Sequence, residues 1–301
     1  MANYLISVVG ATAIGKTALS IKLAQHFNAE IISCDSRQFF KEMNIGTAVP
    51  SVEELRAAKH HFIQHISIFD AYNVGQFEKD AITKLDELFE KNNVVIMVGG
   101  SGLYVDAVVK GLDEFPKVAP EIRAKLNEQL ENQGIESLQE QLQKLDPVYY
   151  ERVTLENPHR LIRALEICIG SGQPYSSFLK DKTATRNFTT IKVGLTAERS
   201  IMYDRINRRV HIMMNEGLLD EAKVLYEHKA LNALQTVGYR ELFEYMDGKC
   251  TLEFAVSEIQ KNTRRFAKRQ GTWFKKDETT LWFDYEADIE KIIQQIESRL
   301  F

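Results

Sequence analysis

The sequence has few cysteines and no long apolar run. Its three cysteines are isolated, at Cys34, Cys168 and Cys250. That spacing predicts neither a disulfide framework nor a zinc site, so we expect packing roles in a reducing compartment. No apolar run approaches the roughly 20 residues that a membrane-spanning helix needs. We therefore expect a cytoplasmic protein that does not associate with a membrane.

An excess of positive charge is also missing. The chain has 38 Lys and Arg against 42 Asp and Glu, for a formal net charge of -4, which argues weakly against a nucleic-acid partner. The distribution matters more, because residues 261–276 contain several Lys and Arg and no acidic residue. This stretch is either a solvated helix face or a surface that binds phosphate groups, and composition leaves both interpretations open.

The most informative stretch that is present is GATAIGKT, residues 10–17. It matches the phosphate-loop pattern and lies between a predicted strand, Tyr4–Val9, and a predicted helix, Ala18–Phe27. Backbone N–H groups converge at such a junction, Lys16 adds a positive charge, and the Thr17 hydroxyl can hold Mg²⁺. The stretch therefore predicts a diphosphate or triphosphate site.

The order of the predicted elements indicates an α/β fold, with a P-loop core whose parallel sheet is flanked by helices. The core comprises residues 1–112 and about 186–301. Residues from about 113 to 185 read as helices alone and predict a helical insertion domain. Long helical patterns follow at residues 198–227 and 252–273. The predicted strands are Leu5–Val9, Glu30–Ser33, Val94–Val98 and Thr190–Leu195.

Two further positions at strand ends suggest chemistry. Asp35 follows the second predicted strand and can ligate Mg²⁺ through water, act as a base, or cap a helix. Nearby Gln38 has one donor and one acceptor, which suits an adenine-like base edge. The third strand runs into Gly99, Gly100 and Ser101, where a substrate could approach the backbone beside a hydroxyl. That strand does not end in Asp, which disfavours a routine triphosphatase.

Together these motifs resemble one family, the tRNA dimethylallyltransferases, also called tRNA isopentenylpyrophosphate transferases. The resemblance covers nearly the whole chain and rests on the order and spacing of its segments. They are GATAIGKT (10–17), DSRQFFKEMNIGTAVP (35–50), HHF (60–62), GGSGLY (99–104), NPHRLIRALE (157–166), GLLDEAKVL (217–225), VGYRE (237–241) and AKRQGTWF (267–274). Ala11, Phe40 and Ser101 stand where the family usually has Pro, Tyr and Thr. No Cys/His cluster follows Trp273, so the chain resembles the bacterial form.

The resemblance implies transfer of a dimethylallyl group from dimethylallyl diphosphate to the exocyclic N6 amine of the adenosine 3′-adjacent to the anticodon of tRNA. It implies a monomer that uses Mg²⁺ at Thr17, with Asp35 as the base and Ser101 positioning the amine or the leaving group. The implied diphosphate-binding residues are Gly10, Thr12, Ala13, Ile14, Gly15, Lys16, Thr17 and Arg199. The insertion would contribute to binding the tRNA anticodon stem-loop. The implied tRNA-binding residues are Asp35, Ser36, Arg37, Gln38, Ser101, Arg123, His159, Arg160, Leu161, Ile162, Arg163, Gln235, Thr236, Val237, Gly238, Tyr239 and Arg240.

Alternative functions share part of this pattern. A P-loop small-molecule kinase would have the loop and the sheet, but it would not need GGSGLY, NPHRLIRALE or the basic C-terminal stretch. An adenine-nucleotide prenyltransferase would use the same donor site with a free nucleotide as acceptor. A regulatory RNA-binding protein without catalysis would not need Lys16, Thr17, Asp35 and Ser101. The predicted insertion and the basic stretch favour a macromolecular acceptor. For the adjacent His60 and His61 we expect packing or hydrogen bonding rather than metal binding.

Overall fold

The computed structural model describes residues 2–179 and 184–300, which form two compact units. The first unit contains the residues up to Lys110 and those from Thr185 onward. The second unit is Gly111–Ala184. No helix in these described ranges is long and apolar enough to cross a membrane.

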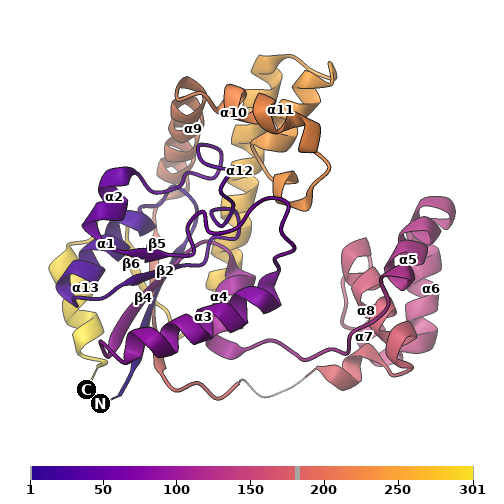
Figure 1. The fold of residues 1–301 in the computed structure, drawn as a ribbon, viewed down its shortest axis with the longest axis horizontal. Coiled ribbons are helices and arrows are strands. Elements are labelled where there is room, and N and C mark those ends of the chain that lie inside the picture. Colours follow the sequence, from indigo (N-terminus) through magenta and orange to yellow (C-terminus); the bar gives the residue numbers. More distant parts are fainter. Residues whose placement is uncertain (1, 180–183, 301) are drawn as a thin grey trace. The chain divides into compact units, whose positions relative to one another are not determined.

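The first unit is built around a six-stranded sheet in the order β3-β2-β4-β1-β5-β6, and all its paired strands are parallel (Figure 1). Its strands are β1 (Tyr4–Gly10), β2 (Ile31–Ser33), β3 (His60–His61), β4 (Val94–Val98), β5 (Thr189–Thr196) and β6 (Leu281–Asp284). The predicted α/β class is confirmed. The sequence analysis did not predict β3 and β6, which contain two and four residues.

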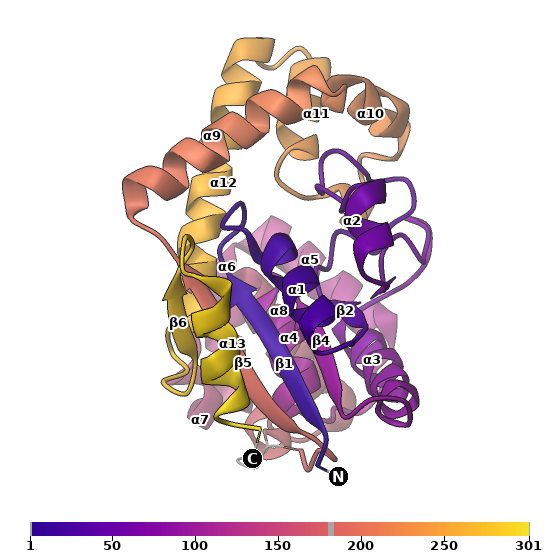
Figure 2. The same cartoon turned by 90° about the vertical axis from the view of Figure 1, so that its left-hand side faces the viewer.

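The two faces of the sheet bury different side chains of the same strands. Along β1, Ile6 and Val8 belong to one core, whereas Leu5 and Val9 belong to the other, as the two-residue period of a strand requires. The first face is covered by α1 (Lys16–His26) and α13 (Ile289–Glu297), and the second by α3 (Val74–Phe89) and α4 (Gly102–Lys110). Figure 2 shows β1 with these layers around it.

The C-terminal part of the first unit adds a helical group with its own core, in which Val210, Leu218, Leu242 and Ile259 are buried. Its helices are α9 (Arg199–Asn215), α10 (Leu218–Leu225), α11 (Tyr239–Met246) and α12 (Leu252–Phe274), with short 3₁₀ turns η2 (Tyr226–His228) and η3 (Asn232–Leu234). α12 also packs against β1 and α4, so it joins this group to the sheet (Figure 2).

The predicted helical pattern over 198–227 is divided into two helices and a short 3₁₀ turn. α9 ends at Asn215, and Gly217 then adopts a φ of 103° in the left-handed region before α10 begins at Leu218. Glycine adopts this conformation without steric cost, so the chain turns there.

Among its described residues, the second unit contains helices and connecting segments but no strand. Its core contains Leu138, Leu142, Leu161 and Leu165, none of which is exposed. Its elements are α5 (Pro120–Gln133), α6 (Ile135–Leu145), α7 (Pro147–Tyr150), α8 (Pro158–Ser171) and the 3₁₀ turn η1 (Tyr175–Phe178). Pro at the first turn of α5, α7 and α8 suits a helix start, where its missing N–H leaves no bond unmade.

Candidate active site

The phosphate loop connects β1 to α1 at the carboxyl edge of the sheet. Gly15 precedes α1 with a φ of 111°, a conformation that favours glycine, and Lys16 is the first helical residue. The Lys16 Nζ donates to the carbonyl oxygen of Ala11 at 2.7 Å. Burial lowers the pKa of Lys16 to about 8, although the nearby Asp35 carboxylate opposes this shift. A polyanion bound in the loop would therefore favour the charged form of Lys16.

Two cavities lie in the first unit. The first, here called the loop cavity, has a volume of about 780 Å³ and is lined by the phosphate loop, residues 12–18, together with residues 47–52. The second, the α12 cavity, has a volume of about 770 Å³ and is lined by residues 100–104, by residues 235–238 and by α12. The linings of both cavities include Thr12, Ala13, Asp35, Thr47, Ala48, Arg209 and Met213.

Asp35 lies on the lining that the two cavities share. It follows β2 at the carboxyl edge of the sheet, and its Oδ1 accepts the N–H of Arg37 at 3.1 Å. Ser101 lines only the α12 cavity, where its Oγ accepts the N–H of Ser36 at 3.2 Å and lies 3.1 Å from the Ser36 Oγ. The structure thus brings together the carboxylate and hydroxyl that the sequence singled out, since Ser36 is the residue next to Asp35.

Gln270 joins three parts of the site, and its role was not predicted. It is 5% exposed, its Oε1 accepts the N–H of Thr12 at 2.8 Å, and its Nε2 donates to the carbonyl of Gly100 at 2.9 Å. The phosphate loop, the turn after β4 and α12 are therefore held at fixed positions. The position of Gln270 within AKRQGTWF was the only sign of this in the sequence.

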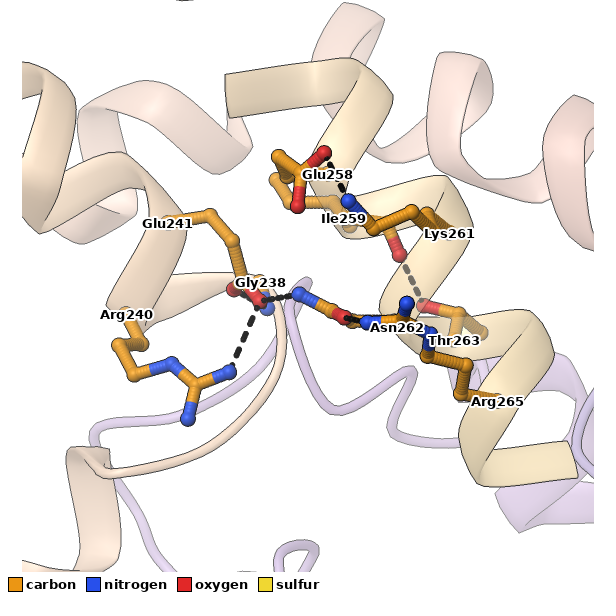
Figure 3. Close-up of polar contacts among 9 residues, drawn as sticks. All are labelled: Gly238, Arg240, Glu241, Glu258, Ile259, Lys261, Asn262, Thr263 and Arg265. Carbon is orange, nitrogen blue, oxygen red and sulfur yellow. Dashed lines mark hydrogen bonds and ion pairs between the residues drawn. The ribbon is translucent and has the colours of Figure 1, made fainter. Parts of the chain in front are cut away.

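The wall of the α12 cavity is held by the buried carboxylate of Glu241 (Figure 3). Glu241 is 2% exposed, and it accepts the N–H of Gly238 at 2.8 Å and the Nδ2 of Asn262 at 2.8 Å. The Arg240 guanidinium lies 3.4 Å away. These bonds tie the segment before α11 to α12.

The α12 cavity is strongly basic. Among the described residues that line it, Asp35 alone is acidic. Its cationic lining residues are Arg37, Arg209, Arg240, Arg265 and Arg269. Such a lining attracts a polyanion such as a nucleic-acid backbone.

Comparisons with known proteins match this chain to one family. The family model described as IPP transferase matches residues 38–277. The chain belongs to the IPP transferase family. It is 64% identical to the tRNA dimethylallyltransferase of Flavobacterium psychrophilum over 99% of each chain. It is 45% identical to tRNA dimethylallyltransferase 1 of Bacteroides fragilis over 96% of each chain. The resemblance read from the sequence is thereby confirmed, including its bacterial type.

Solved structures give the same result for this IPP transferase. A tRNA isopentenylpyrophosphate transferase from Bacillus halodurans aligns with a TM-score of 0.73 and 37% identity, covering 99% of this chain and 95% of that one. A eukaryotic dimethylallyltransferase described as acting on tRNA aligns with a TM-score of 0.78 and 26% identity, covering 99% of this chain and 77% of that one.

Three arginines of α9, Arg205, Arg208 and Arg209, line the loop cavity, and the Arg205 Nε donates to the Ala13 carbonyl of the phosphate loop at 2.8 Å. Arg199, at the start of α9, is absent from both cavity linings and its Nε donates to the Tyr203 hydroxyl at 2.8 Å. Arg209 lines both cavities, and burial lowers its pKa while the Asp35 carboxylate opposes the shift. Sequence reasoning did not single out these three arginines, because α9 carries several and only the packed helix shows which of them line the cavity.

Several residues predicted to contact tRNA in the IPP transferase bond to its own main chain. The Gln38 Nε2 donates to the carbonyls of Thr47 and Ala48 at 3.2 and 2.9 Å, and Gln38 lines the loop cavity. The Arg37 Nη1 donates to two main-chain carbonyls at 3.0 Å, and Arg37 lines the α12 cavity. Tyr239 is 0% exposed and lines neither cavity. Beside it, the α12 cavity is lined by Gln235, Thr236, Val237, Gly238 and Arg240.

The predicted RNA contacts of the second unit form three groups, which differ in exposure and in their hydrogen bonds. The side chains of Leu161 and Ile162 are buried in its core, so they cannot reach RNA. His159 and Arg160 are exposed at the start of α8. Arg123 and Arg163 both bond to the buried Glu166, and Arg123 does so through two nitrogens, at 2.6 and 2.9 Å. Their guanidinium groups remain partly exposed.

Oxygen ligands for a metal ion are available in the loop cavity. Its lining includes the Thr17 hydroxyl and the Asp35 carboxylate, and hydroxyl and carboxylate oxygens suit Mg²⁺. Within the ranges that the structure describes, no three His, Cys, Asp or Glu residues gather into a metal cluster. His60 and His61 form hydrogen bonds instead, with the Ala58 carbonyl at 2.8 Å and with Glu30 at 2.6 Å.

Proposed function

We propose that this IPP transferase transfers a dimethylallyl group from dimethylallyl diphosphate to the N6 amine of the adenosine immediately 3′ of the anticodon in tRNA, and releases diphosphate. The observation that carries the proposal is that the loop cavity and the α12 cavity share Asp35 on their linings. A diphosphate donor and a polyanionic acceptor can therefore approach one carboxylate from two sides.

The loop cavity suits the donor. Breakage of the allylic carbon–oxygen bond leaves negative charge on the departing diphosphate, and preorganised donors stabilise such charge. The loop amides, Lys16 and the three arginines Arg205, Arg208 and Arg209 are groups in this lining that can do so. Mg²⁺ bound at Thr17 would neutralise further charge on the diphosphate oxygens.

The α12 cavity suits the acceptor. An adenosine must leave the stack of the anticodon loop to enter it, at a cost of a few kcal/mol, and the arginines of the lining can bind the flanking phosphates. The exocyclic amine is a weak nucleophile, so removal of its proton during attack lowers the barrier. Asp35 accepts that proton in this scheme, and the Ser101 hydroxyl orients the amine.

The test uses the protein with Mg²⁺ and radiolabelled dimethylallyl diphosphate. An unmodified anticodon stem-loop with an adenosine run and free AMP are offered in parallel, and ATP hydrolysis is followed separately. We expect label in the stem-loop alone. Label in AMP would assign a nucleotide prenyltransferase, and phosphate release from ATP without prenyl transfer would assign a kinase or triphosphatase.

A further inference from the structure

One short segment, residues 44–48, borders both cavities, and we call it the partition segment. Thr47 and Ala48 line both cavities, Asn44 and Ile45 line the loop cavity, and Gly46 lines the α12 cavity. Ala48 has a φ of 50°, which is unfavourable for a residue with a Cβ. Such a conformation persists only where the surroundings hold it in place.

Glu221, in α10, holds the first part of the partition segment. Its Oε2 accepts the N–H groups of Asn44 and Ile45 at 3.1 and 2.8 Å, and its Oε1 accepts the N–H of Gly46 at 2.9 Å. Hydrogen bonds from N–H groups to a carboxylate are stronger than those between neutral groups. Three successive amides on one carboxylate therefore fix the path of this backbone.

Tyr239, the first residue of α11, completes the arrangement. Its hydroxyl donates to the Glu221 Oε1 at 2.5 Å. Burial and the adjacent Glu221 carboxylate raise the pKa of Tyr239, so the hydroxyl keeps its proton and remains a donor. The Tyr239 ring packs against Gly46, where an added Cβ would lie 2.6 Å from the ring. Tyr239 thereby connects the partition segment to residues 235–238 on the α12 cavity.

Gln38 holds the other end of the partition segment. Its side-chain amide donates to the carbonyls of Thr47 and Ala48, and Gln38 follows Asp35 by three residues. The strained Ala48 is thus held between Glu221 and the loop that carries the proposed base. The position of Asp35 relative to both cavities depends on this support.

We propose that Glu221 and Tyr239 are positioning residues for prenyl transfer, which hold the partition segment so that donor and acceptor meet in line at Asp35. The inference rests on the proposed function above. Neither residue is among those that line the loop cavity or the α12 cavity, so each acts through the partition segment in this proposal. Their effect is on alignment, and misplacement of reacting groups by about 1 Å can cost about 10²-fold in rate.

The test compares Tyr239→Phe with Tyr226→Phe. Each change removes one hydroxyl that donates to a carboxylate, because the Tyr226 hydroxyl bonds to the Asp247 Oδ1 at 2.5 Å, and Tyr226 lies outside both linings. The measurements are kcat, the KM for stem-loop and donor, the Kd for inorganic diphosphate, and Tm. We expect Tyr239→Phe to lower kcat about 10- to 100-fold with the diphosphate Kd unchanged. Tyr226→Phe should keep the kcat of the wild type.

A merely structural role predicts a lower Tm with kcat unchanged at a temperature well below the transition, and that result would overturn the inference. Glu221→Gln is the second variant, because it keeps the side-chain size while placing an NH₂ group against backbone N–H donors. If Tyr239→Phe does not fold, kcat, the diphosphate Kd and Tm of Glu221→Gln are compared with those of the wild type instead. Absence of transfer by the wild type would refute the proposed function itself, whereas an active wild type with unaffected variants would refute only the positioning role.

Discussion

At the scale of single residues, Asp35 is the proposed base and the acidic residue that lines both cavities. Asp35→Asn keeps the size of the side chain and removes its capacity to take a proton. We expect turnover to fall about 10²- to 10⁴-fold, the usual worth of a general base. Single-turnover transfer to the stem-loop measures this effect, and a gel-shift assay should show RNA binding retained. Near-normal turnover would remove Asp35 from the base role.

Arg209 and Arg199, two of the arginines of α9, give a second prediction at this scale. We expect Arg209→Ala to weaken inorganic diphosphate binding about 10- to 100-fold, since a hydrogen bond to a charged group is worth about 1.5–3 kcal/mol. Arg199→Ala is the matched control on the same helix, and it should have little effect because Arg199 lies outside both linings. Isothermal titration calorimetry measures both variants. The reverse ranking would restore the role that the family resemblance gave to Arg199.

The side-chain roles were predictable from the sequence only where a motif fixed the local backbone. Lys16 and Thr17 are placed by the strand–loop–helix junction itself, so pattern alone located them. Gln38 was expected to form hydrogen bonds to a base edge, yet its side-chain amide donates to main-chain carbonyls. A linear sequence does not show which backbone carbonyls lie within reach of a side chain.

At the scale of elements, a buried ion pair joins β5 to the turn before β6. Lys192 is 8% exposed and its Nζ donates to the Asp277 Oδ2 at 2.5 Å. Burial alone would raise the pKa of Asp277, but the hydrogen bonds from Lys192 and Thr279 outweigh it and lower the pKa to about 2. The carboxylate is therefore charged in the folded protein at a pH where it would be protonated in the unfolded chain.

This pair predicts a pH-dependent contribution to stability. Because the folded pKa is depressed, the contribution is present above about pH 4 and is lost as the pH falls toward 2. Asp277→Asn leaves the buried Lys192 charge with only the more distant Asp106 carboxylate, whose Oδ1 lies 3.9 Å from the Lys192 Nζ. The change should lower the free energy of unfolding at pH 7 by about 3 kcal/mol. Urea unfolding at pH 7 and pH 3 measures the difference, which should shrink at the lower pH. The double variant Lys192→Met/Asp277→Asn should recover much of the loss, and no recovery would contradict this account.

The elements themselves were predictable where their periodicity extended over several turns or alternations. β1, β4 and α12 have long patterns and were located from the sequence. The strand pairing of β3 and β6 depends on neighbours that are distant in the chain, so their few residues gave no signal. The break at Gly217 was missed because the apolar spacing resumes in α10 on the other side of it.

At the scale of the whole molecule, we expect the two units to have different roles. The cavities lie in the first unit, whereas the second carries exposed cations such as Arg160 at the start of α8. We expect Arg160→Ala to weaken stem-loop binding several-fold and to reduce the slope of log affinity against log salt by about 0.7 to 0.9. The diphosphate Kd should not change. Lys144→Ala, an exposed residue of the same unit, is the control, and equal effects of both changes would indicate general charge attraction only.

The long helix α12 sets the distance between two parts of the site. Asn262 is bonded to the wall of the α12 cavity through Glu241, and Gln270 is bonded to the phosphate loop. The two residues are eight positions apart in the helix, or about 12 Å along the axis. One inserted residue between them would turn one anchor by about 100° relative to the other. Surface loops can therefore change in length while the distance from the phosphate loop to the wall of the α12 cavity stays constant, because helical pitch sets that distance.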